Sequence, residues 1–159
     1  MPKLARQYWL MKSEPDAFSI ADLESKGTAP WDGVRAYAAR SNMVAMQLGD
    51  LVLFYHSSCV PPGAVGIASV VKLAYPDPTQ FDPKSQYFDA KSKPDAPRWR
   101  MVDVTFVSRF PRMVTLEVMR QDPELAEMVV VKPGRLSVQP VKPGEFARVV
   151  KLGGGKLPR

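Results

Sequence analysis

The sequence is poor in the residues that build redox sites and zinc centres. Its 159 residues include one cysteine, Cys59, and one histidine, His56. A single cysteine excludes an intrachain disulfide, so a secreted scaffold held by disulfides is ruled out and a reducing compartment fits. A zinc site of histidine and cysteine needs at least three protein ligands, which this chain cannot supply. We therefore expect neither a metal nor a cofactor.

Long apolar runs and phosphate-binding glycine motifs are also missing. The longest apolar stretch, Leu51–Tyr55, is far shorter than a membrane span. The charged N-terminus leads into no apolar segment of a signal peptide. The three glycines at 153–155 have neither the spacing nor the hydroxyl of a P-loop. We expect an intracellular protein without membrane contact, cytoplasmic in general, associated with the nucleoid in a bacterium or nuclear in a eukaryote.

Positive charge is in excess and lies in the second half of the chain. The formal net charge is +6, and residues 81–159 hold 15 basic and 9 acidic side chains. This imbalance favours contact with a polyanion such as nucleic acid, although proteins without such a partner also reach this charge. The length predicts one domain, which we place at residues 1–152 with a flexible tail at 153–159. We expect a monomer.

Proline positions and hydrophobic periodicity divide the chain into short elements. Strands are predicted at residues 8–12, 51–56, 64–73, 99–107 and 135–141, and helices at 19–27, at 35–46 and from residues 122 and 143 onward. The stretch from 75 to 98 holds five prolines and few aliphatic residues, which indicates a long irregular loop. Because most strands are apolar on both faces, we predict an α+β fold, a small closed or nearly closed mixed β-barrel of five to six strands with short flanking helices.

Polar and aromatic residues gather near the ends of these strands, where they could meet at one barrel mouth. The residues that we expect to bind a ligand are Lys12, Ser13, Trp31, Arg35, Asn42, Tyr55, His56, Ser57 and Trp99. An aromatic wall with a few fixed hydrogen-bonding groups suits a flat heteroaromatic guest such as a nucleobase. The alternative is that the aromatic residues are core plugs with one wet edge.

Three of these residues carry a further alternative. Asn42, the only asparagine, either pairs with the edge of a base or faces solvent. Arg35 either contacts the ligand or braces the turn at Asp32. His56 adjoins Ser57, but neighbouring strand residues point to opposite faces, which disfavours a serine nucleophile with a histidine base.

Basic side chains cluster around the irregular loop and the strand that follows it. Those that we expect to contact a nucleic-acid backbone are Lys84, Lys91, Lys93, Arg98 and Arg100, with aromatic residues interleaved among them. The alternative is a solvated loop whose aromatic residues tuck into the domain.

Several separated blocks of the sequence resemble the EVE domain family over about residues 8–152. These blocks are YWLMKSEP at 8–15, WDGVR at 31–35, GDLVLFYHS at 49–57, GIA at 66–68, AYPD at 74–77, PRW at 97–99 and RLSVQP at 135–140. The resemblance implies a PUA-like fold related to the YTH and ASCH domains, and binding of nucleic acid that carries a modified base. By likeness to YTH readers, Trp31 matches a wall of an aromatic cage, and Lys12 and Ser13 match the strand end that lines the pocket. Ala36 and Ala38 stand where many relatives have amides.

Two functions from different classes remain. The first is a non-enzymatic module that recognises a modified nucleobase, for example a modified cytosine, in DNA or RNA. The second, implied by ASCH-like relatives, is an amide hydrolase acting on an acylated nucleoside, with Lys12, Glu14 and the hydroxyl of Ser13 or Thr28 as its machinery. We expect the first.

Overall fold

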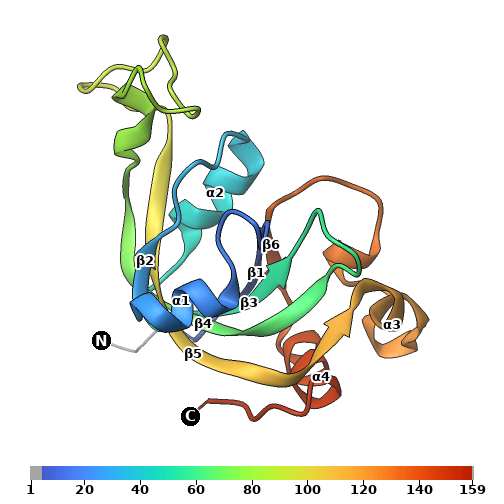
Figure 1. Cartoon of the computed structure of the whole chain (residues 1–159). Helices are drawn as coiled ribbons and strands as arrows, with labels where there is room; N and C mark the ends of the chain where they lie inside the picture. The colour runs from blue at the N-terminus through green and yellow to red at the C-terminus, as the bar shows by residue number, and fades with distance from the viewer. Residues whose placement is uncertain (1–4, 159) are drawn as a thin grey trace.

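A computed structural model describes residues 5–158, which form one six-stranded mixed sheet with helices on both faces (Figure 1). The strands are β1 (Tyr8–Ser13), β2 (Thr28–Pro30), β3 (Leu51–His56), β4 (Gly63–Pro76), β5 (Arg100–Thr115) and β6 (Val138–Val141), in the sheet order β2-β5-β4-β3-β1-β6. The helices are α1 (Ile20–Lys26), α2 (Tyr37–Ala45), α3 (Leu116–Gln121) and α4 (Pro143–Leu152), with short 3₁₀ turns at Pro78–Phe81, Pro123–Leu125 and Val129–Val131.

The centre of the sheet is the parallel pair β1 and β3, extended by the β3–β4 hairpin. Ser13 lies opposite His56 in this pair, so the carboxyl ends of both strands meet at one edge of the sheet. On the other side of β1, the antiparallel strand β6 places Val138 opposite Met11. These registers determine which of the expected ligand residues lie near one another.

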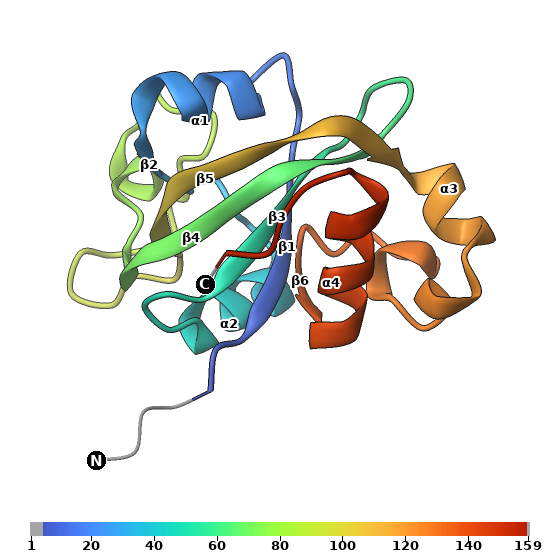
Figure 2. The same ribbon diagram turned by 90° about the horizontal axis from the view of Figure 1, so that it is seen from below.

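Alternate strand residues feed two separate hydrophobic cores, one on each face of the sheet. The first core holds Trp9, Met11 and Phe54, and it is covered by buried residues of α1 and α2. The second core holds Leu10, Leu53 and buried residues of α3 and α4. Figure 2 shows α3 and α4 gathered at the opposite end of the view from α1 and β2.

The expected closed or nearly closed barrel is not what the chain forms. The sheet order ends at β2 and β6, and no pairing joins these two edge strands within the described residues 5–158. The strands are apolar on both faces because helices cover each face of the sheet, as in other layered folds. The α+β class, the six strands and the short flanking helices are confirmed.

Element boundaries differ from the sequence prediction mainly in β5. This strand runs sixteen residues, to Thr115, although Pro111 interrupts its pattern. The three-residue strand β2 and the helix α3 were not predicted, and the ladder of β6 begins at Val138 rather than at residue 135. Within residues 5–158, no helix is long and apolar enough to cross a membrane.

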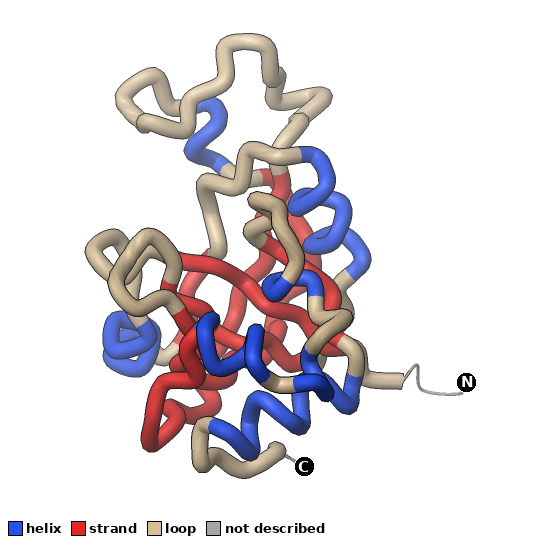
Figure 3. Tube along the Cα trace, turned by 90° about the vertical axis from the view of Figure 1, so that its right-hand side faces the viewer, coloured by secondary structure: helices blue, strands red, loops and turns tan. Residues whose placement is uncertain are grey.

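Residues 77–99 form the irregular loop, which stands away from the sheet beside α2 (Figure 3). At the other end of the chain, the segment after α4 starts in contact with β5. The carbonyl of Gly153 accepts a hydrogen bond from the Arg112 amide, and Gly153 and Gly155 lie against the Phe110 ring. The flexibility expected for residues 153–159 stays a prediction.

Candidate functional site

The meeting of β1 and β3 is tied together by side chains at both strand ends. The Ser13 hydroxyl donates to the carbonyl of Phe18 at 2.6 Å, and the Ser57 amide donates to the carbonyl of Ser13 at 3.0 Å. His56 Nε2 accepts from the amide of Ile20 at 3.1 Å and so satisfies a free N–H at the start of α1. Three of the expected ligand residues, Ser13, His56 and Ser57, are thus brought together.

Trp31 lies close to this strand end, on the same face of the sheet. Its ring meets Phe54 edge-on, with centroids 5.3 Å apart, and meets Phe18 in the same way at 6.4 Å. Phe54 in turn meets the His56 ring edge-on at 5.7 Å. Trp31 is 7% exposed and belongs to the first core. The indole is therefore packed into the core, as the alternative of a core plug describes, and the half-buried Phe18 lies beside it.

Asn42 reaches the same region from the helix above. Its side-chain amide donates to the carbonyl of Val138 at 2.7 Å. Since Val138 pairs with Met11, and Met11 pairs with Phe54, the three strands place Asn42 and Trp31 around one row of buried residues. The single asparagine of the chain is half-buried and attaches α2 to β6 instead of facing open solvent.

Lys12 and Tyr55 lie on the opposite face of the sheet. The two residues are paired in the β1–β3 register, and the Lys12 ammonium sits 5.9 Å from the centre of the Tyr55 ring. Tyr55 is buried in the second core. Burial lowers the pKa of Lys12 and raises that of Tyr55. The sheet therefore separates these two residues from Trp31 and Ser13.

Arg35 and Trp99 belong to the base of the 77–99 loop. All five N–H groups of the guanidinium have acceptors: the carbonyls of Val34 and Tyr87, the Asp77 carboxylate and the Thr79 hydroxyl. Its carbon lies 5.5 Å from the centres of both the Tyr87 and Trp99 rings. This geometry favours the bracing interpretation of Arg35, although its carboxylate partner is Asp77 rather than Asp32.

Trp99 is held from both sides and from its edge. Tyr37 stacks on it at 5.0 Å, and its indole N–H donates to Asp89 at 2.8 Å. The ring is 7% exposed. Trp99 thus joins the loop to α2, away from the strand ends that hold Ser13 and His56.

The expected backbone-contact residues are spread over this loop. Lys84, Lys91 and Lys93 are exposed, and Arg98 lies 3.9 Å from Asp89. The 77–99 loop also carries acidic side chains equal in number to its basic ones, Asp77, Asp82, Asp89 and Asp95 against Lys84, Lys91, Lys93 and Arg98. The loop by itself is therefore electrically balanced, and Arg100 lies just beyond it on β5.

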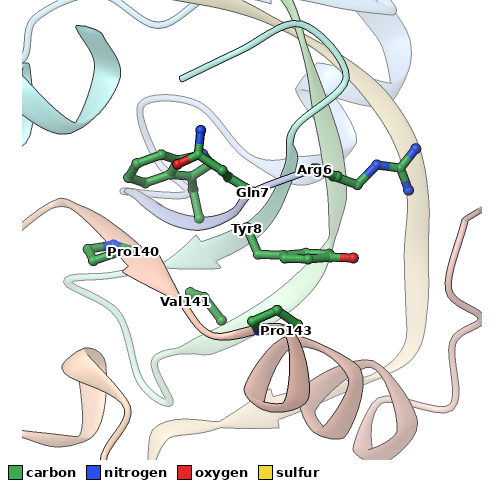
Figure 4. Close-up of a pocket in the computed structure, with 7 residues that line it drawn as sticks. Arg6, Gln7, Tyr8, Pro140, Val141 and Pro143 are labelled. Carbon is green, nitrogen blue, oxygen red and sulfur yellow. The ribbon is translucent and has the colours of Figure 1, made fainter. Parts of the chain in front are cut away.

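The surface of residues 5–158 includes two hollows of moderate size that the sequence did not indicate. One, of about 260 Å³, lies between the start of β1 and the start of α4, where Tyr8 faces Val141 and Pro143 (Figure 4). The other, of about 330 Å³, is lined by Ile20, His56, Val65 and the segment Arg109–Met113. Only the second touches a residue that we expected to bind ligand.

The protonation of His56 should be visible in the pH dependence of stability. Burial, and then the charge of Arg109, lower the pKa of His56 below its unfolded value of about 6.5. The unfolded chain then takes up the proton first, so stability is full above about pH 6.5 and falls as the pH drops toward the folded pKa. A proton on Nε2 would also abolish acceptance from the Ile20 amide.

We expect the free energy of unfolding to fall between pH 7 and pH 5.5, measured by urea denaturation. Because His56 is the only histidine, His56→Gln should flatten the curve in this interval. An unchanged slope in that variant would show that another group is responsible.

The chain has close relatives among known proteins. A family model described as the EVE domain matches residues 7–152. The chain belongs to the EVE domain family. Thymocyte nuclear protein 1 of Mus musculus is 44% identical over 91% of this chain and 73% of the relative. The resemblance seen in the sequence is thereby confirmed.

Several solved structures superpose closely on this chain. A hypothetical protein from Leishmania major has a TM-score of 0.92 at 49% identity, over 94% of this chain and 96% of that one. The human THYN1 protein in complex with 5-methylcytosine containing DNA has a TM-score of 0.88 at 41% identity, over 96% and 99%. An ASCH protein from Zymomonas mobilis, at 11% identity and a TM-score of 0.51, shares the fold alone. The expected PUA-like fold is confirmed.

Proposed function

We propose that this EVE domain is a DNA-binding module that recognises a modified base, with 5-methylcytosine as the first base to test. The observation that carries the proposal is the likeness to the human protein in complex with 5-methylcytosine containing DNA, which extends over 96% of this chain. The basic second half of the chain supports a polyanionic partner. The proposal makes the chain a binding protein and assigns no catalytic residue.

The base-binding site in this proposal is the region around Trp31, Ser13, Asn42 and His56 on one face of the sheet. A base that leaves the duplex would displace the half-buried Phe18 and stack beside the Trp31 indole. The polar groups of Ser13 and Asn42 already have partners in the chain, so a base would either exchange with these partners or use their remaining acceptor positions. Lys12 and Tyr55 lie on the opposite face of the sheet, so they would contact the DNA strand only at the edge of the sheet.

The energies set the size of the expected preference. Extruding a base costs a few kcal/mol, and stacking on an aromatic ring returns about 1–3 kcal/mol, so these two contributions nearly cancel. Burying the additional methyl group of 5-methylcytosine contributes about 0.8 kcal/mol, which is about a fourfold preference. The remaining affinity must come from phosphate contacts, which depend on salt concentration and not on the base.

We expect the wild-type chain to bind an oligonucleotide with 5-methylcytosine about fourfold more tightly than the unmodified one, and Trp31→Phe to reduce this ratio toward one. Phenylalanine keeps the site apolar, whereas Trp31→Ala would leave a large cavity in the first core. Fluorescence anisotropy with DNA and RNA oligonucleotides at two salt concentrations measures the ratio.

The matched control is Trp9→Phe, because Trp9 is a tryptophan of the same core that donates to Asp50 at the other end of β1. It should leave the ratio unchanged. Equal affinity of the wild type for methylated and plain DNA would contradict base recognition. Hydrolysis of an acylated cytidine that Lys12→Ala abolishes would favour the ASCH-like amide hydrolase instead, for which the distant likeness supplies only the fold.

A further inference from the structure

The 330 Å³ hollow beside His56 exists because β5 bulges away from β4. Ala64 pairs with Val114 and Gly66 pairs with Arg109, so β4 advances two residues while β5 advances five. The three additional residues arch out of the ladder around Pro111, which has no N–H to donate. Bulges of this kind re-aim side chains and are frequent beside functional sites. Here the bulge forms one wall of the hollow, and the side chain of Val65 lines it.

Two arginines border this hollow. Arg112 donates through Nε to the carbonyl of Leu152 at 3.0 Å, and no carboxylate lies within ion-pair distance of it among residues 5–158. Arg109 lies 3.5 Å from Glu24, and both side chains are about half exposed, 52% and 48%. An exposed pair at this distance is weak and is easily exchanged for another anion. The hollow therefore offers two guanidinium groups to a ligand in solvent.

The opposite wall of the hollow is formed by His56 and Ile20. Since His56 Nε2 accepts from the Ile20 amide, the neutral imidazole carries its proton on Nδ1 and retains one donor. Burial and the neighbouring Arg109 keep the pKa of His56 low, so the ring does not compete with the arginines as a cation. The side chains of Arg109, Arg112 and His56 thus present hydrogen-bond donors to the hollow. Glu24 is the acidic neighbour of Arg109.

We infer that this hollow binds a backbone phosphate of the DNA strand whose modified base enters the site at Trp31, with Arg109 and Arg112 as its contacts. The inference rests on the proposed function and adds a second contact to it. The two sites share a wall: His56 borders the hollow, and its ring meets Phe54, which meets Trp31. A nucleotide extruded toward Trp31 therefore carries a neighbouring phosphate past His56 toward the β5 bulge, where Arg109 lies 3.5 Å from Glu24 of α1.

The electrostatic signature separates this contact from base recognition. Each phosphate neutralised by a side chain contributes about 0.9 to the slope of log affinity against log salt concentration for duplex DNA. A phosphate contact also acts equally on methylated and plain DNA. Removing it therefore lowers both affinities and leaves their ratio intact, whereas a change in the base site alters the ratio.

The test compares Arg109→Ala and Arg112→Ala with the control Arg120→Ala, an exposed arginine of α3. Each of the first two variants is expected to weaken binding of both oligonucleotides about tenfold at low salt, the effect of losing one hydrogen bond between charged groups. The salt slope should become shallower in each, and by about 0.9 in the double variant Arg109→Ala/Arg112→Ala, which leaves the phosphate without a cation. Arg120→Ala should change neither quantity. Arg112 also holds the segment after α4 through its bond to Leu152. The thermal unfolding of Arg112→Ala is therefore compared with that of Arg109→Ala, so that a loss of folding is told apart from a loss of binding.

Neutral methylphosphonate linkages, placed one at a time on either side of the modified base, locate the phosphate. One position should weaken the wild type about a hundredfold, because both arginine contacts are lost, and weaken Arg109→Ala and Arg112→Ala about tenfold each. The same linkage should cause no further loss in the double variant Arg109→Ala/Arg112→Ala. Glu24→Gln, which frees Arg109, should strengthen binding of both oligonucleotides. The phosphate site would be overturned by losses that add fully at every linkage, or by salt slopes equal to that of the wild type. The proposed function would still stand in that case if the wild type prefers methylated DNA and Trp31→Phe loses this preference. Absence of any DNA binding by the wild type would overturn both.

Discussion

Asp77→Ala is expected to lower the free energy of unfolding by about 3–5 kcal/mol, because it removes one partner of a buried ion pair. The Asp77 side chain is fully buried. It accepts from the amide of Gly33 at 2.8 Å, from Arg35 at 3.1 Å and from the amide and hydroxyl of Thr79 at 2.8 and 2.6 Å. Although burial acts to raise the pKa of Asp77, the hydrogen bonds from Thr79, Gly33 and Arg35 hold it below its usual value.

Urea denaturation followed by circular dichroism measures this loss. Asp82→Ala is the matched control, since Asp82 is exposed and its carboxylate accepts from the amide of Lys84 at 2.9 Å. The effect of this variant should stay within about 0.5 kcal/mol. Limited proteolysis should then cut the 77–99 loop of Asp77→Ala before that of the control. A loss below about 1 kcal/mol would mean that the Arg35 pair is no more than a solvated surface contact.

The second large effect is expected for Phe54→Ala. Phe54 is fully buried, and its ring meets Phe18, Trp31 and His56. Truncating a buried phenylalanine costs about 3–5 kcal/mol, which combines lost apolar burial with the cavity left behind. The same denaturation experiment measures this change. Phe88→Ala, at a phenylalanine that is 43% exposed, should cost far less.

A milder variant connects this packing with binding. Phe54→Leu keeps an apolar side chain and should fold, but it removes the ring that packs against Trp31. We expect the preference for methylated DNA to decrease while affinity for plain DNA is retained. Unchanged preference in Phe54→Leu would show that the orientation of Trp31 does not depend on this contact.

Local signals in the sequence determined most of the elements. The strand at 51–56 is confirmed with the same bounds. The helix predicted at 19–27 is confirmed as α1, with a capping box between Ser19 and Asp22 at its start and Gly27 as its C-cap. Such features depend on neighbours within four residues, which is why a single sequence reveals them. The length of β5 was not revealed, because the bulge around Pro111 breaks the alternation on which strand prediction relies.

Which residues come together in the candidate site depends on the register of the strand pairs, and this register could not be predicted from the sequence. A shift of one residue exchanges the two faces of a strand, so Ser13 and Lys12, adjacent in the chain, lie on different faces and in contact with different cores. Arg35 was expected at the ligand, with a brace of the turn at Asp32 as the alternative, but the loop returns across 42 residues to place Asp77 against it. A contact between residues so far apart in the sequence produces no pattern in either segment from which it could be predicted.

The division of each central strand between two cores has a consequence for how such domains diverge. Alternate positions of β1 and β3 build the side that carries Trp31, and the remaining positions build the side closed by α3 and α4. A substitution at one set of positions therefore changes the packing of one core and leaves the side chains of the other core in place. Related sequences can thereby differ in one core while the other core still holds the sheet together.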